Sequence, residues 1–215
     1  MKALITMPDY DTATSYLCCY AEELVRFAEN NGISISQMKR PRLRRESVEA
    51  VLIKQRPHLL LFNAHGDEQT IYGDKLGSEE EYLIRESKNH QLLDGKMTYA
   101  RACSAAASLG KTVKNGCFIG YNQPFSFWTD ITRTTTPLKD NVARLFLQPS
   151  NDLAIALLKG KSACAAADIF ISQSKKNILY LLGKQDELGA MASATLLWSN
   201  MMAQEVIGNE EMSCS

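Results

Sequence analysis

The chain has 215 residues, of which 45% are hydrophobic and 22% charged, and its 24 basic and 24 acidic side chains cancel. This length suits one well-filled domain, so we expect residues 1–215 to form a single domain. The balanced charge argues against nucleic acid or a membrane as a direct partner, because both usually demand a basic excess.

The composition also favours a reducing compartment. No stretch approaches the roughly 18 apolar residues that cross a bilayer, and no secretory signal precedes the first strand-like run. Six cysteines occur without a C-x-x-C spacing, so we expect neither a metal site nor a cofactor. We therefore predict a cytoplasmic protein with free thiols.

The first third of the chain alternates strands and helices. Residues 3–7 and 33–38 are predicted to be short strands, and the apolar run 59–64 a third. Apolar side chains three and four positions apart predict helices over 12–31 and 46–55. This order is typical of an α/β fold, and we predict a three-layer α/β/α sandwich whose mostly parallel central sheet has about six strands.

The middle of the chain is less regular. Segment 67–94 is polar and poorly periodic, so we expect it to be mainly loop. Strands are predicted over 96–102 and 116–121, and the small-residue segment 104–109 between them is expected to be a helix. The Thr-rich segment 129–137 is predicted to be a mobile loop.

The last third is mostly helical, with predicted helices over 151–158 and 163–182. Residues 194–208 fit either a helix or a final strand. The basic segment 39–45 indicates a solvated loop and helix start, with a docking patch for an acidic partner as the alternative.

Two of the predicted strands are followed directly by reactive side chains. His65-Gly66 follows 59–64, and Cys103-Ser104 follows 96–102. Ligands bind open α/β sheets outside the carboxyl ends of their strands, so both residues are expected at the functional edge. Each residue alone is more often structural, but a thiol beside an imidazole is the minimal machinery of nucleophilic acyl transfer.

Local sequence strengthens this interpretation. Gly66 allows close approach of a substrate to the backbone. If a helix begins at Cys103, its amide groups and dipole should lower the pKa of the thiol.

The two blocks LLLFNAHG (59–66) and TYARAC (98–103) resemble the caspase-like cysteine peptidases of clan CD. In that family one hydrophobic block ends in His-Gly and a second ends in Ala-Cys. The chain resembles the bacterial CHAT and gingipain-like branch more than animal caspases, because the caspase sequence Q-A-C-x-G is absent. The resemblance covers essentially the whole chain and implies the caspase-like form of the sandwich.

The resemblance implies a cysteine endopeptidase that acts on protein or peptide substrates. His65 would activate the thiol of Cys103, the amides of Gly66 and Cys103 would hold the oxyanion, and no metal would take part. Bacterial relatives often act as effectors in defence or programmed death, and a regulatory protein partner is a further expectation.

The resemblance also implies which residues recognise the substrate. Its specificity pocket lies beside the dyad, and the positions that line it here are Asp9, Asp11, Arg101, Trp128 and Asp130. The aspartates favour a basic substrate residue before the cleaved bond (P1), whereas Arg101 favours an acidic one. Alternatively, Arg101 pairs with an aspartate, and Asp9 and Asp11 serve a turn and a helix cap. We expect a basic preference carried by Asp9 or Asp11.

Two other functions remain open. The chain can be a catalytically inert caspase-like interaction module, a pseudo-peptidase. It can also be another cysteine enzyme on a flavodoxin-like sheet, such as a glutamine amidotransferase, although Ala102-Cys103-Ser104 lacks the flanking glycines of that elbow.

Overall fold

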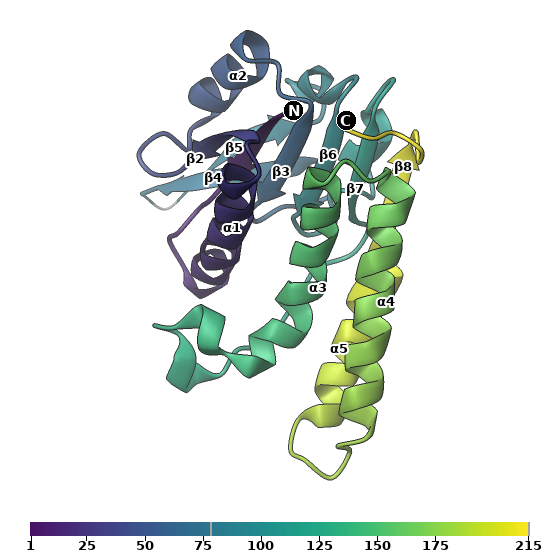
Figure 1. Cartoon of the computed structure of the whole chain (residues 1–215). Coiled ribbons are helices and arrows are strands. Elements are labelled where there is room, and N and C mark those ends of the chain that lie inside the picture. The colour runs from purple at the N-terminus through teal and green to yellow at the C-terminus, as the bar shows by residue number, and fades with distance from the viewer. Residues whose placement is uncertain (78, 215) are drawn as a thin grey trace.

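The computed structural model describes residues 1–77 and 79–214, and its centre is a six-stranded sheet (Figure 1). The strand order is β2-β1-β3-β6-β7-β8, in which the first five strands run parallel and β8 runs antiparallel to β7. The predicted α/β class and mostly parallel sheet are therefore confirmed. The strands are β1 (Lys2–Thr6), β2 (Ser34–Met38), β3 (Leu59–Asn63), β6 (Met97–Arg101), β7 (Cys117–Tyr121) and β8 (Gln204–Gly208).

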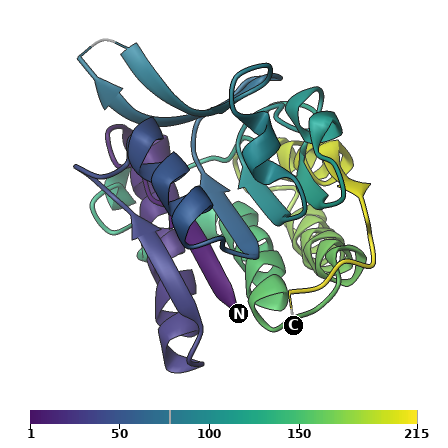
Figure 2. The same cartoon turned by 90° about the horizontal axis from the view of Figure 1, so that it is seen from above.

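Helices cover both faces of the sheet. Strand side chains that point to one face of the sheet, such as Leu61 and Tyr99, join an apolar cluster with α1, α3 and α4. Side chains that point to the other face, such as Leu60 and Ala100, join a second cluster with α2. The result is the predicted three-layer sandwich (Figure 2). The helices are α1 (Thr12–Asn30), α2 (Arg45–Lys54), α3 (Asn141–Leu158), α4 (Ala163–Leu182) and α5 (Ala190–Ala203).

The sequence predicted that segment 67–94 is mainly loop, and this prediction is wrong. It forms the antiparallel hairpin β4 (Thr70–Leu76) and β5 (Glu79–Arg85), which stands out from the body of the molecule in Figure 2. Register shifts interrupt the pairing, so the apolar residues do not alternate regularly along the sequence. Ile71, Leu83 and Ile84 are nevertheless fully buried in the second cluster.

The predicted helix over 104–109 is also wrong, because these residues form turns. The residues after Cys103 form backbone hydrogen bonds with the chain at and just beyond the end of β7. Ser104 N–H donates to the Gln123 carbonyl, and Ala106 N–H donates to the Tyr121 carbonyl. Within the segment, Ala107 N–H donates to the Ser104 carbonyl and Gly110 N–H to the Ala105 carbonyl, so the spacings are three and five residues instead of the four of an α-helix. Ser104 adopts a left-handed backbone conformation, with φ of 56°, that non-glycine residues rarely adopt.

Helix α3 begins at Asn141, ten residues earlier than predicted, and it contains Pro149. Proline has no N–H to donate to the carbonyl four residues earlier, which belongs to Leu145. Asn177 of α4 donates its side-chain Nδ2 to that carbonyl at 2.8 Å, so a neighbouring helix satisfies the orphaned acceptor. Helix α4 has the predicted bounds.

The ambiguous segment 194–208 divides between the end of α5 and β8. The Thr-rich segment 129–137 contains the short 3-10 turn Ile131–Arg133. In the described part of the chain, no helix is both long and apolar enough to cross a membrane.

The basic segment 39–45 is partly neutralised within the fold. Lys39 pairs with Glu22 at 3.1 Å, Arg40 pairs with Asp74, and Arg45 lies 3.8 Å from Glu49. This internal pairing favours the solvated-loop interpretation over a docking patch.

Candidate functional site

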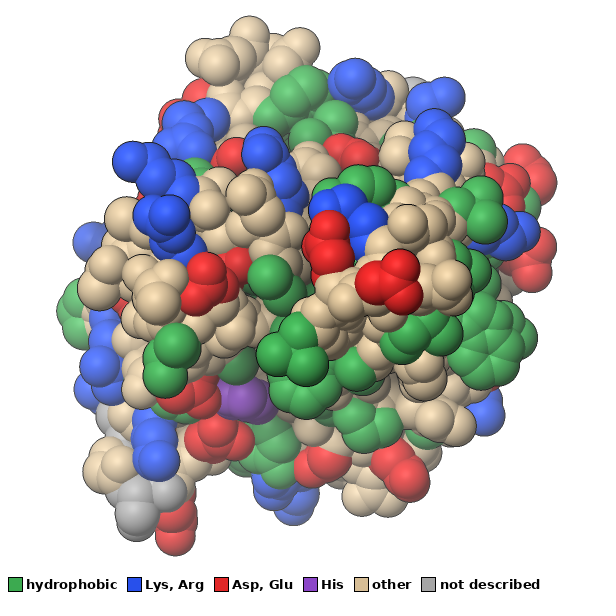
Figure 3. Space-filling model, turned by 90° about the horizontal axis from the view of Figure 1, so that it is seen from below, with side chains coloured by type: hydrophobic (Ala, Val, Ile, Leu, Met, Phe, Trp, Pro, Cys, Tyr) green, Lys and Arg blue, Asp and Glu red, His purple; other side chains and the backbone are tan. Residues whose placement is uncertain are grey.

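His65 and Cys103 lie at matching positions on neighbouring strands. Asn63 of β3 pairs in register with Arg101 of β6, and each reactive residue follows two positions later. Side chains alternate along a strand, so both continue on the face that packs against α1, α3 and α4. Figure 3 views the molecule from the end where the parallel strands finish, and a histidine is visible there beside acidic side chains.

Asp11 holds the imidazole of His65. Its Oδ2 lies 2.7 Å from His65 Nε2, while its Oδ1 accepts the Thr14 N–H and caps α1. Burial acts to raise the pKa of the Asp11 carboxyl, but the hydrogen bonds from Thr14 and His65 outweigh it and hold that pKa below its usual value. An ionised carboxylate only accepts hydrogen bonds, so Nε2 of His65 is the donor to Asp11, and in the neutral form of the ring Nδ1 carries the lone pair.

The ring of Tyr10 also lies beside His65, with 5.9 Å between the ring centroids. Tyr10 donates its hydroxyl to Glu80 of β5 at 2.7 Å, so the hairpin supports this loop.

Gly66 brings the His65 segment against the Cys103 segment. A Cβ on Gly66 would lie 2.9 Å from the Cβ of Ala102 and 3.0 Å from the carbonyl oxygen of Cys103. Only glycine fits this close approach between the two segments, and the approach of a substrate to Gly66 stays a prediction.

The surroundings of the Cys103 thiol favour its protonated form. Its Sγ donates to the carbonyl oxygen of Phe125, 3.6 Å away. Burial raises the pKa of the Cys103 thiol above its usual value. The expected lowering of this pKa by a helix N-terminus does not occur, because turns follow Cys103.

A cavity of about 540 Å³ opens beside Cys103. The residues that line it follow the ends of β3, β6 and β7: Gly66, Asp67, Glu68, Gln69, Cys103, Ser104 and Pro124. Sequence reasoning did not single out Asp67, Glu68, Gln69 or Pro124. Their position directly after the His-Gly block and after the strand over 116–121 was the available signal.

Arg101 does not line this cavity. Its side chain is only 1% exposed and lies in the core under α3. Its Nε donates to Asn63 Oδ1 at 2.7 Å, and its Nη1 donates to Ser150 Oγ at 3.0 Å and to Asn151 Oδ1 at 2.8 Å. Nη2 is buried without a hydrogen-bond partner in the structure. Both sequence interpretations, selection of an acidic substrate and pairing with Asp9 or Asp11, are corrected, because the guanidinium is buried and bonds neutral side chains.

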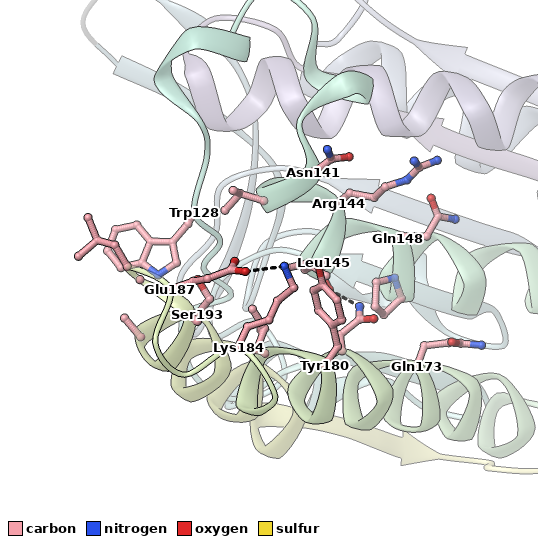
Figure 4. Close-up of a pocket in the computed structure, with 18 of the residues that line it drawn as sticks. Trp128, Asn141, Arg144, Leu145, Gln148, Gln173, Tyr180, Lys184, Glu187 and Ser193 are labelled. Carbon is pink, nitrogen blue, oxygen red and sulfur yellow. Dashed lines mark hydrogen bonds and ion pairs between the residues drawn. The ribbon is translucent and has the colours of Figure 1, made fainter.

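The remaining predicted pocket residues lie elsewhere. Asp9 accepts a hydrogen bond from Ser15 in the first turn of α1, and Asp130 caps a 3-10 turn through Thr132. Trp128 is 52% exposed and lines a separate groove between α3 and the α4–α5 hairpin (Figure 4). The structure therefore pairs His65 with Asp11 and packs Gly66 against the Cys103 segment, whereas the cavity beside Cys103 is not lined by Asp9, Arg101, Trp128 or Asp130.

Within residues 1–77 and 79–214, no three His, Cys, Asp or Glu side chains gather as metal ligands. No protein-family model matches the chain, and no curated protein matches it either.

Replacing Arg101 by Met should destabilise the protein by at least about 3 kcal/mol, because Asn63, Ser150 and Asn151 would keep buried, unpaired oxygens. Urea denaturation measures this loss, and Arg42→Met, at an exposed arginine, is the control. Equal stability of the two variants would contradict the buried role of Arg101.

The raised pKa of the Cys103 thiol predicts slow alkylation by iodoacetamide at pH 7. Only the thiolate reacts, so the rate should rise about tenfold per pH unit below that pKa. Peptide mass spectrometry of Cys103, against the same chain unfolded in urea, measures the rate. Faster labelling in the folded protein at pH 7 would instead indicate a resting thiolate.

Proposed function

We propose that the chain is a cysteine endopeptidase of the caspase-like type, with Cys103 as nucleophile, His65 as general base and Asp11 as the residue that orients the imidazole. One observation carries the proposal: a thiol and an imidazole follow neighbouring parallel strands at the same register and parity, and a carboxylate fixes the imidazole. Nucleophile, base and orienting group are the three parts that activated-nucleophile catalysis needs.

The chemistry proceeds in two halves. His65 Nδ1 takes the proton of the Cys103 thiol, and the thiolate attacks the peptide carbonyl carbon to form a tetrahedral oxyanion. The imidazolium then gives its proton to the leaving amine as the C–N bond breaks. Water, deprotonated by His65, hydrolyses the thioester and releases the acid and the thiol.

The backbone supports the oxyanion in this proposal. The N–H of Gly66 donates no hydrogen bond to another part of the described chain, and the Cα of Gly66 packs against the Cys103 segment. Donors of this kind typically contribute about 10²–10³ in rate each. Substrate binding would also displace the thiol from the Phe125 carbonyl, which releases it for attack.

We further propose a basic P1 residue, recognised by carboxylates other than those the sequence suggested. Asp67 and Glu68 line the cavity beside Cys103. Asp67 accepts hydrogen bonds from Tyr72 and Gln69, whereas the exposed carboxylate of Glu68 is left to pair with a substrate cation. A cation in the substrate would complete this pair.

The second candidate function is an inert interaction module. The raised pKa of the Cys103 thiol and its hydrogen bond to Phe125 favour it, because both keep the sulfur protonated. The six unpaired cysteines support a reducing compartment for either function, and we propose the cytoplasm.

Substitutions in the proposed machinery should separate activity from stability. Cys103→Ala should abolish cleavage of a fluorogenic peptide, and His65→Ala should reduce it at least about 10²-fold. Asp11→Asn preserves the helix cap but presents an amide N–H to Nε2, so kcat should fall about 10²-fold with the melting temperature unchanged.

The matched control for Asp11 is Asp9→Asn, which changes a neighbouring carboxylate that bonds Ser15. It should keep the wild-type kcat. Absence of cleavage by the wild type, together with no labelling of Cys103 by peptidyl acyloxymethyl ketones, would support the inert module instead.

Glu68→Gln should reduce kcat/KM for Arg and Lys substrates about tenfold or more, since one charge-assisted contact is lost. A panel with Arg, Lys, Asp and Glu at P1 measures this change, and Asp130→Asn, outside the cavity, is the control. Cleavage confined to the Asp and Glu substrates would overturn the basic preference.

A further inference from the structure

A second and larger concavity lies away from Cys103. It has a volume of about 930 Å³ and lies between α3 and the hairpin formed by α4 and α5, with Trp128 at one end (Figure 4). Its floor is apolar, with Val142, Leu145 and Pro149 from α3 facing Tyr180 and Leu181 from α4. We call this concavity the helical groove.

Two neighbouring helices form the long walls of the helical groove. The α3 wall contributes lining positions from 141 to 152 at spacings of three and four, and the α4 wall contributes positions 173, 177, 180 and 181, with Lys184 just beyond the end of α4. Eleven residues of helix correspond to about 16 Å, or three turns. A seam between two neighbouring helices is the site where a third helix packs in a bundle.

The charges along the groove specify an orientation. Lys184 and Glu187 pair with each other at 2.8 Å and cancel. Arg144 and Asp152 remain at opposite ends, eight residues or about 12 Å apart along α3. Asp152 accepts only the neutral amide of Gln148, at 3.0 Å, and Arg144 is exposed without an ion pair among the described residues.

We propose that the helical groove binds an amphipathic helix of about three turns from a protein partner. Its apolar stripe fills the floor, a basic residue faces Asp152, and an acidic residue two turns later faces Arg144. The helix then runs antiparallel to α3, which also brings its positive N-terminal end to Asp152 and its negative C-terminal end to Arg144.

One short segment of the chain connects the helical groove to Cys103. Trp128, at the end of the groove, lies three residues after Phe125, whose carbonyl accepts the Cys103 thiol. Between them, Ser126 is held by Asn200 of α5 through two hydrogen bonds, of 3.1 and 2.6 Å. The proposal extends to Cys103: a helix that displaces Trp128 and this part of α5 would shift the Phe125 carbonyl and change the exposure of the thiol, whether or not Cys103 is catalytic.

Two stapled 14-residue peptides test the docking site. Both carry the same leucine stripe; one has Lys two turns before Glu, and the other has these two residues exchanged. The chain has two tryptophans, so Trp198→Phe leaves Trp128 as the single fluorescent reporter. We expect saturable binding in which the Lys-to-Glu peptide is about fivefold tighter, because the exchanged peptide forms the same ion pairs only in the parallel orientation, where its helix dipole opposes Arg144 and Asp152.

The matched control variant is Arg144→Gln with Asp152→Asn, which should remove the preference between the peptides while circular dichroism reports an intact fold. Equal affinity of the wild type for both peptides, no binding, or a preference that persists in this variant would overturn the proposal. Self-association of the wild type that Leu188→Glu abolishes would assign the groove to a second copy and also overturn it.

The coupling is measured by iodoacetamide labelling of Cys103 at saturating Lys-to-Glu peptide. We expect the labelling rate to change at least about threefold, which is small beside the range that thiol access and pKa can give. An unchanged rate with the groove occupied would overturn the coupling, and this result would not depend on peptidase activity.

Discussion

The buried guanidinium of Arg101 is the constraint on which the site geometry depends. Burial of a cation costs several kcal/mol unless acceptors surround it, and burial lowers the pKa of this group. Three side-chain oxygens provide acceptors, from Asn63 on β3 and from Ser150 and Asn151 on α3. Because Asn63 and Arg101 each stand two residues before a reactive side chain, this network fixes the relative position of the two strand ends. Helix α3 is fastened to the same point.

A second polar centre organises the loops around that edge. The buried carboxylate of Asp140 caps α3, accepts the hydroxyl of Tyr16 on α1, and accepts the N–H of Asp130. It therefore joins α1, α3 and the segment after β7. Asp11 has a similar double role, since one oxygen caps α1 and the other holds His65. Both carboxylates tie the start of a helix to the edge of the sheet.

Buried strands and long amphipathic helices could be predicted from the sequence because their periodicity follows from burial on one or both faces. Helix α4 has the predicted bounds for this reason. The start of α3 was missed because Pro149 normally breaks a helix, and the rescue by Asn177 comes from residues far along the chain. The turn after Cys103 depends equally on distant carbonyls of β7.

The candidate site, too, could be predicted from the sequence only in part. Positions of His65, Gly66 and Cys103 follow from strand ends, which are local. The role of Asp11 as the partner of His65, and the burial of Arg101, depend on which neighbouring elements supply hydrogen-bond partners. When a charged residue lies close in sequence to a candidate site, the sequence alone does not indicate whether its side chain faces solvent or the core.

The protonated state of the Cys103 thiol has a consequence for the chemistry of oxidation. Peroxides attack thiolates far faster than thiols. Desolvation raises the pKa of Cys18 to about 11, of Cys117 to about 12 and of Cys214 to about 11, and the pKa values of Cys19 and Cys164 are also raised. The folded molecule therefore offers peroxide almost no anionic sulfur, and its thiols should oxidise slowly at neutral pH.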